Sequence, residues 1–456
     1  MALKITVIGT GYLGATHAAA MAELGFEVLG LDIVPEKIEM LSQGRVPMYE
    51  PGLEELLQRH VAGIEGATGR LRFTTSWEEA GEFGDVHFVC CNTPQKHGEY
   101  ACDMSYVDNA FRWLAPHLKA NALVVGKSTV PVGSAARLAG MLRDLAPAGE
   151  GVELAWNPEF LREGFAVKDT LHPDRIVVGV ESVGAPPSGS WGRAEKLLRE
   201  VYAGPVGEGS PFVVTDFPTA ELVKTAANSF LATKISFINA MAEVCEAADG
   251  DVAKLAEALG HDERIGKKFL RAGIGFGGGC LPKDIRAFMA RAGELGADQA
   301  LTFLREVDSI NMRRRGHMVE LAREAVGGGS FLGKRVAVLG ATFKPDSDDV
   351  RDSPALNVAG QIHLQGGQVT VYDPKGMENA RRLFPTLGYA ETALDAVRSA
   401  DVVLHLTEWR EFRELDPAAL GAVASERILL DGRNALDPVA WREAGWVYRA
   451  MGRPRA

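Results

Sequence analysis

The chain contains little cysteine, and its cysteines are not spaced to hold a metal. Five cysteines occur among 456 residues, an odd number with no C-x-x-C pair. Such a set argues against a small secreted scaffold stapled by disulfides and against a zinc site, and it fits a reduced cytosolic setting. We therefore predict no metal site and a cytoplasmic location.

Long apolar runs and an excess of positive charge are also absent. No stretch approaches the roughly 20 apolar residues that a membrane-spanning helix needs, and the first strand is expected from about residue 3, which leaves no room for a signal peptide. Acidic residues outnumber basic ones by 60 to 49, for a formal net charge of −11. We therefore expect no membrane and no nucleic-acid partner. The length leaves room for roughly three globular domains.

A glycine-rich turn follows a buried apolar run at residues 5–8. In this GxGxxG pattern Gly9 makes the tight turn, Gly11 lets the backbone reach a pyrophosphate, and Gly14 lets helix and strand pack closely. A second apolar run ends in Asp32, roughly 20 residues further on. Its carboxylate can accept hydrogen bonds from a ribose 2′-hydroxyl and would repel a 2′-phosphate. The sequence therefore predicts a βαβ unit that binds NAD in preference to NADP.

The segment 275–284, GFGGGCLPKD, places a thiol between a glycine-rich loop and the expected start of a helix. Glycines let the backbone approach a ligand, and Pro282 suits the first helical position. Both the helix N-terminus and Lys283 favour the thiolate of Cys280, which is its nucleophilic form. A buried structural cysteine is the alternative, but the glycines together with Lys283 and Asp284 favour a nucleophile.

The rest of the N-terminal half alternates between strand and helix patterns. The strand candidates span residues 86–90, 123–125, 152–156 and 176–178. Alternation of this kind builds a doubly wound parallel sheet, whose ligands lie beyond the carboxyl ends of the strands. The polar runs at such ends are residues 92–94, 128–131 and 157–164. We expect these runs to face a bound ligand.

Two long helical patterns occupy the middle of the chain, from about 219 to 249 and from about 298 to 326, and a glycine-rich linker follows them at 327–330. A second α/β unit then starts with a strand near 335. Its further strand candidates are 369–373, 402–406 and 428–431. The pattern of this unit resembles that of the first half but lacks the full GxGxxG. It therefore indicates either a diverged nucleotide-binding half or a purely structural domain.

Together these patterns predict an α/β protein with two Rossmann-like, doubly wound parallel-sheet domains joined by a central helical module. Ordered motifs along nearly the whole chain resemble those of the nucleotide-sugar 6-dehydrogenases. They are GTGYLG at 9–14, YEPGLEEL at 49–56, Thr93-Pro94, KSTVPVG at 127–133, NPEFLREG at 157–164, Lys224 with Asn228, GFGGGCLPKD at 275–284, FKPDSDDVRDSP at 343–354 and DGRN at 431–434. The resemblance implies an NAD-binding domain over 1–205, a helical dimerisation module over 206–327 that makes a homodimer, and a UDP-binding domain over 328–456.

The same resemblance implies oxidation of a primary alcohol to a carboxylate, with two NAD reduced per turnover. A thiol can capture the intermediate aldehyde as a thiohemiacetal, and oxidation of that adduct gives a thioester. Cys280 suits this task, and the resemblance places Lys224, Asn228 and Asp284 around the oxygen of the reacting carbon. Lys224 and Asn228 are four residues apart, so they share a helix face and can stabilise an oxyanion together. An exposed helix turn is the alternative for this pair.

Glu159 and Glu163 are also four residues apart, a spacing that would put both carboxylates on one helix face. The resemblance makes Glu159 the candidate base for thioester hydrolysis, with Glu163 nearby; a base of this kind needs a pKa near the working pH. It also places Thr129 near the reactive carbon and the hydrolytic water. A hydroxyl that caps a turn is the alternative for Thr129.

The resemblance further implies two sets of binding residues. The implied cofactor contacts are Gly9, Gly11, Tyr12, Leu13, Gly14, Asp32, Lys37, Thr93, Thr129, Glu163, Lys283 and Arg351. The implied contacts to the sugar nucleotide are Glu159, Phe160, Leu161, Glu163, Lys224, Asn228, Arg264, Phe276, Gly277, Cys280, Phe343, Lys344 and Arg433. Arg264 is implied to act in the neighbouring subunit's site. Lys344 and Arg433 are cations near strand ends that suit a diphosphate, or alternatively surface charges.

Several alternatives remain open for the substrate and for the class of function. The segments 49–52 and 158–160 favour conversion of UDP-glucose to UDP-glucuronate, but GDP-mannose or a UDP-N-acetylhexosamine would use most of the same motifs. A hydroxyacid dehydrogenase that transfers a single hydride would leave Cys280 idle. A binding module that senses NAD or a sugar nucleotide would not need the catalytic set. Gly279, where many relatives carry a small polar residue, and the Cys90-Cys91-Asn92 run depart from the family pattern without removing a catalytic group.

Overall fold

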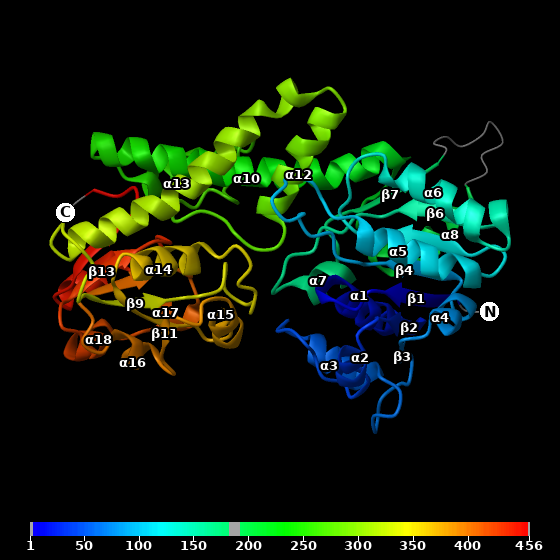
Figure 1. The fold of residues 1–456 in the computed structure, drawn as a ribbon, viewed down its shortest axis with the longest axis horizontal. Helices are drawn as coiled ribbons and strands as arrows, with labels where there is room; N and C mark the ends of the chain where they lie inside the picture. Colours follow the sequence, from blue (N-terminus) through cyan, green and yellow to red (C-terminus); the bar gives the residue numbers. More distant parts are fainter. Residues whose placement is uncertain (1–2, 182–191, 455–456) are drawn as a thin grey trace. The chain divides into compact units, whose positions relative to one another are not determined.

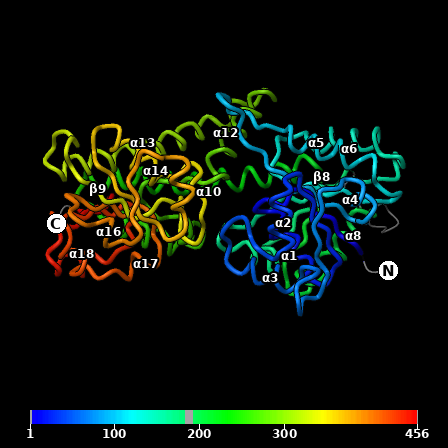
Figure 2. Tube along the Cα trace, turned by 60° about the horizontal axis from the view of Figure 1, so that its bottom comes forward, coloured from blue at the N-terminus to red at the C-terminus, as the bar shows by residue number. Residues whose placement is uncertain are grey.

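The computed structural model describes residues 3–181 and 192–454. The chain divides into two compact units, residues 1–227 (unit 1) and residues 228–456 (unit 2). Each unit contains one parallel-dominated sheet with helices (Figure 1). Figure 2 follows the course of the chain from the N-terminus to the C-terminus. None of the helices in the described residues is long and apolar enough to cross a membrane.

Unit 1 is built on an eight-stranded sheet with the order β3-β2-β1-β4-β5-β6-β7-β8. Its neighbours pair in parallel except β6 with β7. The strands are β1 Lys4–Ile8, β2 Glu27–Leu31, β3 Leu71–Thr74, β4 Val86–Val89, β5 Leu123–Gly126, β6 Glu153–Trp156, β7 Ile176–Val180 and β8 Phe212–Asp216. The order reverses direction between β1 and β4, which is the switch point where ligands of such sheets bind.

Helices cover both faces of this sheet, so most of its strands are buried and apolar along their length. The helices are α1 Tyr12–Glu23, α2 Pro35–Ser42, α3 Leu53–His60, α4 Trp77–Phe83, α5 Ser105–Leu114, α6 Ser134–Leu145, α7 Ala166–Leu171, α8 Arg193–Val201 and α9 Ala203–Gly207, with 3-10 turns η1 Ala115–His117 and η2 Gly149–Gly151. Helix α1 packs on the sheet through alanines such as Ala15, Ala18 and Ala22, whose small side chains allow a close approach.

Unit 2 contains a six-stranded, fully parallel sheet with the order β11-β10-β9-β12-β13-β14. The strands are β9 Arg335–Leu339, β10 Gln368–Tyr372, β11 Gly388–Tyr389, β12 Val402–His405, β13 Ile428–Asp431 and β14 Val447–Ala450. Its helices are α14 Pro354–Leu364, α15 Met377–Leu383, α16 Ala393–Val397, α17 Arg410–Arg413, α18 Pro417–Val423 and α19 Pro438–Glu443. The strand order repeats that of the first six strands of unit 1. The similarity between the two halves of the sequence therefore corresponds to a structural repeat.

Long helices lie between the two sheets in the sequence. They are α10 Phe217–Ala248, α11 Val252–Gly260, α12 Leu281–Glu294 and α13 Thr302–Ala325, with a 3-10 turn η3 Asp298–Leu301. Within unit 2, Ser236 of α10 donates its hydroxyl to the Val307 carbonyl of α13 at 2.7 Å. The predicted fold class, two doubly wound domains joined by helices, is confirmed.

The acid that follows the second strand of each sheet is held by donors of its own unit. At the end of β2, Asp32 accepts hydrogen bonds from the N–H and the hydroxyl of Thr10, from the Val34 N–H and from the Lys37 ammonium. At the matching position of unit 2, Asp373 accepts from both the N–H and the hydroxyl of Thr342 and, in addition, from the indole of Trp409 at 3.0 Å. The indole of Trp409 is an additional donor in unit 2, and through it Asp373 is linked to the segment that follows β12.

Candidate active site

The glycine-rich turn after β1 is shaped for a bound pyrophosphate. Gly9 adopts a φ of +85°, and a Cβ added to Gly14 would lie 1.9 Å from the Gly9 carbonyl oxygen. Helix α1 begins directly afterwards at Tyr12, behind Gly11, which has no side chain to cap the helix. The first N–H groups of α1 therefore remain available to an anion, as in other dinucleotide-binding turns.

Asp32, which follows β2, and Lys37 of α2 lie in direct contact. Asp32 is buried, and its carboxylate accepts hydrogen bonds from the Thr10 N–H and from the Lys37 ammonium at 2.8 Å. The carboxylate stands where the ribose of a dinucleotide is held in such folds. The turn, the helix N-terminus and the acid together fit NAD.

The loops after β4 and β5 are joined beside this turn. The hydroxyl of Thr93 donates to the Thr129 carbonyl oxygen at 2.8 Å, and the hydroxyl of Ser128 donates to the Cys91 carbonyl oxygen at 2.6 Å. Both predicted threonines therefore lie at the switch point of the sheet. The bond from Thr93 shows that its hydroxyl also has a structural task.

Unit 1 brings Glu159 and Lys224 into direct contact. The Lys224 ammonium donates to Glu159 Oε1 at 3.0 Å, and the two side chains are only 6% and 14% exposed. The Lys224 ammonium also lies 5.6 Å from the ring centroid of Phe160. Two predicted catalytic residues and one predicted substrate contact thus share one sheltered corner of unit 1.

The expectation that Glu159 and Glu163 share a helix face is wrong. Residues 157–162, which all belong to the described part of the chain, are not helical, and α7 starts only at Ala166. Pro158 has no N–H to donate and favours an extended residue before it. Glu159 Oε2 instead accepts a hydrogen bond from the Leu161 N–H at 2.7 Å, so the side chain shapes its own loop.

Glu50 holds the same loop from the other side, a role that sequence reasoning missed. Its two carboxylate oxygens accept the N–H groups of Gly164 and Ala166, each at 2.7 Å. The Tyr12 hydroxyl oxygen accepts the Gly164 N–H as well, at 2.9 Å. Glu50 lies in the YEPGLEEL segment, so the motif itself was a signal, but its partner residues are far away in the sequence.

Lys127 is a second residue whose role the sequence did not reveal. It is buried, and its ammonium donates to Asn157 Oδ1 at 3.0 Å and to the Tyr202 hydroxyl at 3.4 Å. Burial lowers the pKa of Lys127 to about 8, although the charge of Glu159 counteracts that effect. Lys127, Asn157, Glu159 and Tyr202 line one pocket of unit 1.

In unit 2, Cys280 is the N-cap residue of α12 and its side chain is exposed. Asp284, in the first turn of this helix, is buried and accepts a hydrogen bond from Asn228 Nδ2 at 2.7 Å. Lys283 forms an ion pair with the same carboxylate, so the negative charge of Asp284 partly neutralises the positive charge of Lys283. Three predicted catalytic residues, Cys280, Asn228 and Asp284, therefore meet at the start of α12.

The glycines before Cys280 allow neighbouring segments of unit 2 to pack closely against this loop. A Cβ at Gly275, whose φ is +90°, would lie 2.1 Å from Asn311 Oδ1, and a Cβ at Gly277 would lie 2.2 Å from the Asp352 carbonyl oxygen. A Cβ at Gly279 would lie 2.3 Å from the Arg351 guanidinium carbon. Larger residues at these positions would push the loop away from its supports.

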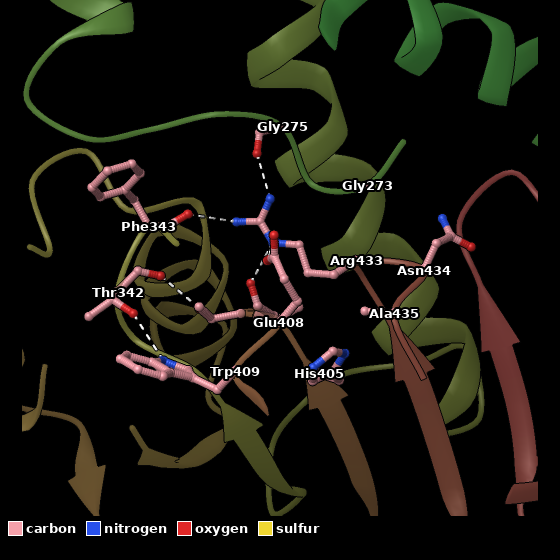
Figure 3. Close-up of polar contacts among 12 residues, drawn as sticks. Gly273, Gly275, Thr342, Phe343, His405, Glu408, Trp409, Arg433, Asn434 and Ala435 are labelled. Carbon is pink, nitrogen blue, oxygen red and sulfur yellow. Dashed lines mark hydrogen bonds and ion pairs between the residues drawn. The ribbon is translucent and has the colours of Figure 1, made fainter. Parts of the chain in front are cut away.

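Arg433 occupies the centre of the strand-end region of unit 2 (Figure 3). Its guanidinium donates to the carbonyl oxygens of Gly275 at 2.7 Å, Leu406 at 2.8 Å and Phe343 at 3.2 Å. Burial lowers the pKa of Arg433, and the nearby carboxylate of Glu408 partly offsets that effect. The reading of Arg433 as a surface charge is therefore wrong.

The comparisons with known proteins agree with this arrangement. Residues 3–203 match the NAD binding domain of the UDP-glucose/GDP-mannose dehydrogenase family, residues 218–313 match its central domain, and residues 337–438 match its UDP binding domain. A UDP-glucose 6-dehydrogenase of Rhizobium meliloti (strain 1021) is 41% identical over 452 residues, which cover 99% of this chain and 100% of the relative. The chain belongs to the UDP-glucose/GDP-mannose dehydrogenase family.

Solved structures of similar proteins support the same assignment. A UDP-glucose dehydrogenase from Pyrobaculum islandicum is 36% identical and superposes with a TM-score of 0.88, over 99% of this chain and 98% of that one. A UDP-D-ManNAc dehydrogenase from Pyrococcus horikoshii is 27% identical, with a TM-score of 0.84 and full coverage of both chains.

The remaining candidate residues of this family member are spread over both units. Leu13, Phe160 and Leu161 line the same pocket as Glu159. Phe276 is buried in the loop before Cys280, and the Lys344 ammonium lies 5.5 Å from the Phe343 ring centroid. Glu163 is half-buried in the turn before Gly164.

Two predicted arginines pair with carboxylates in their own loops. Arg264 is 89% exposed and contacts Asp262 at 2.6 Å. Arg351 binds Asp349 at 2.7 Å, while its guanidinium lies against Gly279. Within unit 2, the structure thus places Arg351 next to the Cys280 loop and leaves Arg264 on the surface.

Proposed function

We propose that this protein is an NAD-dependent UDP-glucose 6-dehydrogenase that oxidises UDP-glucose to UDP-glucuronate and reduces two NAD per turnover. The observation that carries the proposal is the exposed thiol of Cys280 at the N-terminus of α12, beside the Asn228–Asp284 pair. The relatives named UDP-glucose 6-dehydrogenase, 36–41% identical over 99% of the chain, favour this sugar nucleotide.

The first half of the reaction turns the C6 alcohol into an aldehyde and then into a thioester. NAD, when bound, accepts the hydride that leaves C6 in each of the two oxidations. The Cys280 thiolate attacks the aldehyde carbon, so a C–S bond forms and the carbonyl electrons move to oxygen. Lys224 and Asn228, one turn apart on α10, stabilise that oxyanion. Loss of the second hydride restores the carbonyl as a thioester.

The second half of the reaction is hydrolysis. Glu159 removes a proton from water, the resulting hydroxide adds to the thioester carbon, and the C–S bond breaks to release the carboxylic acid and the thiolate of Cys280. The acid then loses its proton to solvent and leaves as the carboxylate. The ion pair with Lys224 and the bond from the Leu161 N–H hold the Glu159 carboxylate in a fixed orientation. Thr129, at the end of β5, is proposed to help place the water.

The binding residues keep the roles that the family resemblance implies, as proposals. The Gly9–Gly14 turn, Asp32 and Lys37 are proposed to hold NAD with Thr93, Glu163, Lys283 and Arg351. The sugar nucleotide is proposed to contact Phe160, Leu161, Phe276, Gly277, Phe343, Lys344 and Arg433. The three-domain division at 1–205, 206–327 and 328–456 and a cytoplasmic location also belong to this proposal.

Central helix α10 supports the proposal of a homodimer. Phe230, Phe237 and Val244 follow one another at intervals of seven residues and are 66%, 47% and 57% exposed. Residues seven apart lie on one helix face, so α10 presents an apolar stripe in unit 2. A second copy of the chain is proposed to cover this stripe, and Arg264 is then proposed to contact that copy's sugar site.

The close alternative is the same chemistry on another sugar nucleotide. It is favoured by the likeness to the UDP-D-ManNAc dehydrogenase of Pyrococcus horikoshii, although that protein shares only 27% identity. A binding module without turnover would need neither the exposed thiol nor the buried pairs Glu159–Lys224 and Asn228–Asp284. We therefore rank it last.

The proposal is tested by the yield of NADH per sugar consumed. UDP-glucose, GDP-mannose and UDP-N-acetylmannosamine are each supplied in limiting amount with excess NAD, and NADH is read by absorbance. Two NADH per UDP-glucose and little from the others is the expected result. Two from another sugar would change the substrate, and one or none from every sugar would remove the thioester mechanism.

A further inference from the structure

The loop that leads to Cys280 is held by bonds to several other segments of unit 2, among them Asn239 of α10, which accepts the Gly273 N–H at 2.9 Å. The Ile274 N–H donates to the Gly432 carbonyl oxygen at 2.9 Å, and the Gly278 N–H donates to the Arg351 carbonyl oxygen at 2.9 Å. Between them, the amide of Asn311 binds both backbone groups of Phe276, at 2.7 and 3.0 Å. These bonds leave the Gly275 carbonyl oxygen to be satisfied by another donor.

That donor is Arg433, whose three bonds reach three separate segments. Nη1 donates to Gly275 in the Cys280 loop, Nη2 to Phe343 after β9, and Nε to Leu406 after β12. Figure 3 shows the guanidinium between the Gly275 and Phe343 carbonyls. One side chain therefore ties the Cys280 loop to two strand ends of the sheet.

A guanidinium is well suited to such a tie. It is planar, keeps its charge when buried, and presents its N–H groups in fixed directions. Hydrogen bonds from a charged donor are stronger than those between neutral groups. Glu408, 3.4 Å away, supplies a balancing negative charge without replacing any of the three carbonyls. Truncation of Arg433 would leave all three carbonyl oxygens without this donor.

We propose that Arg433 is a positioning residue for Cys280, clamping the nucleophile loop to the sheet of unit 2 before any ligand binds. The inference rests on the proposed function only for the role of Cys280 as nucleophile. It goes beyond the contact to the sugar nucleotide that the family resemblance implies for Arg433. A residue that binds a ligand alone would affect KM, whereas a clamp on the nucleophile loop also affects kcat and the loop in the ligand-free protein.

The test is hydrogen exchange of the ligand-free protein, read by mass spectrometry on peptides that cover 273–280. Arg433→Met removes the guanidinium, and Arg433→Lys keeps the charge without the planar fork. We expect exchange in this loop to accelerate by roughly ten- to a hundredfold in Arg433→Met, the range set by the loss of a hydrogen bond to a charged group. Arg433→Lys should show an intermediate acceleration.

Two controls separate the clamp from other effects. Peptides covering β9, Arg335–Leu339, report on the sheet and should exchange as in the wild type. Lys344→Met changes a neighbouring cation that is also a proposed substrate contact, and it should raise KM without accelerating exchange at 273–280. Unchanged exchange of the loop in both Arg433 variants would overturn the proposal. Acceleration in β9 as large as that in the loop, in both variants, would also overturn it, because Arg433 would then stabilise the whole unit.

A second readout follows Cys280 directly. Alkylation of the ligand-free protein by iodoacetamide at several pH values reports the environment of the thiol, and the profile should change in Arg433→Met but not in Lys344→Met. Steady-state kinetics should show a lower kcat and a higher KM for Arg433→Met. Neither exchange nor alkylation requires turnover. If the wild type oxidises no sugar nucleotide, the proposed function fails while the clamp is still tested.

Discussion

The Glu159 carboxylate and the Lys224 ammonium form an ion pair at 3.0 Å in a sheltered corner of unit 1. The pair joins a loop after β6 to the first turns of α10, although 65 residues separate the two in sequence. Buried charges are costly unless they are paired, and removal of one partner leaves the other uncompensated. The pair therefore fixes a carboxylate in place and makes both residues sensitive to substitution.

Glu159→Gln should stall the reaction after the oxidations. The amide cannot take a proton from water, so the turnover rate should fall by roughly 10²–10⁴-fold, the usual contribution of a positioned general base. A thioester should then accumulate on Cys280 and appear in intact-mass spectrometry as an adduct. Glu150→Gln, an exposed glutamate, is the matched control and should turn over normally. Rapid turnover by Glu159→Gln would remove the residue from the role of base.

Cys280→Ser should prevent normal completion of the second oxidation. An alcohol is a weaker nucleophile than a thiolate, so the reaction should stop near the aldehyde or form a slowly hydrolysed ester. In a single-turnover experiment the second NADH should therefore form much more slowly than the first. A stop at the aldehyde gives a yield below two, whereas an ester gives two NADH with delayed release of UDP-glucuronate. Cys102→Ser tests whether loss of any thiol has this effect, and it should retain a yield of two. A full yield at normal speed from Cys280→Ser would contradict covalent catalysis.

Because of Lys127, the free energy of unfolding should depend on pH between about 8 and 10.5. Its folded-state pKa is about 8, lowered mainly by burial from the ordinary value of 10.5. Between these values the unfolded chain binds more protons than the folded one, so the contribution of Lys127 to stability rises with pH across this window. Lys127→Met removes the buried charge together with the bonds to Asn157 and Tyr202, so the stability of the variant relative to the wild type should be highest near pH 7 and should fall as the pH rises.

Denaturant unfolding at several pH values between 7 and 10.5 measures this effect as the difference between Lys127→Met and the wild type. The difference should fall as the pH rises, because the wild-type lysine loses its buried charge. Lys196→Met, an exposed lysine on α8, is the control and should show no such trend. A constant difference at all pH values would mean that Lys127 does not titrate in this range.

Glu50→Gln should loosen the loop that carries Glu159. One carboxylate oxygen becomes an NH₂ group, so one of the N–H groups of Gly164 and Ala166 loses its bond to Glu50, although Gly164 keeps its bond to the Tyr12 hydroxyl. We expect a loss of about 1.5–3 kcal/mol in the free energy of unfolding, the usual contribution of a hydrogen bond to a charged group. Glu54→Gln, exposed on α3, should unfold like the wild type in the same denaturant titration. Equal stability of the two variants would contradict the holding role.

Asp32→Ser should weaken the preference for NAD. The substitution removes the acceptor for a ribose 2′-hydroxyl and the charge that repels a 2′-phosphate, and it frees Lys37 from its ion pair at 2.8 Å. The ratio of kcat/KM for NAD to that for NADP should fall, by a lower value for NAD and a higher one for NADP. An unchanged ratio would show that Asp32 does not select the cofactor.

Local sequence was enough to predict the elements that carry the chemistry. The glycines at 9–14 followed by Asp32 identify the first βαβ unit, because their backbone demands are local and specific. The strand at 335–339 and its successors follow from apolar runs that a doubly wound sheet buries on both faces. Cys280 lies at a helix start for the same reason, since Pro282 and the glycines before it punctuate the chain there.

The sequence by itself determined the two Rossmann-like sheets and the helices between them, and it singled out Cys280 as the proposed nucleophile. Only the tertiary structure decided which partners hold these groups: Glu50 on the loop of Glu159, Lys127 beneath it, and Arg433 on the loop of Cys280. It also replaced the expected helix of Glu159 and Glu163 by a loop. The physical reason is that local periodicity and turn chemistry act between near neighbours, whereas a buried charge takes its partners from segments that only folding brings together.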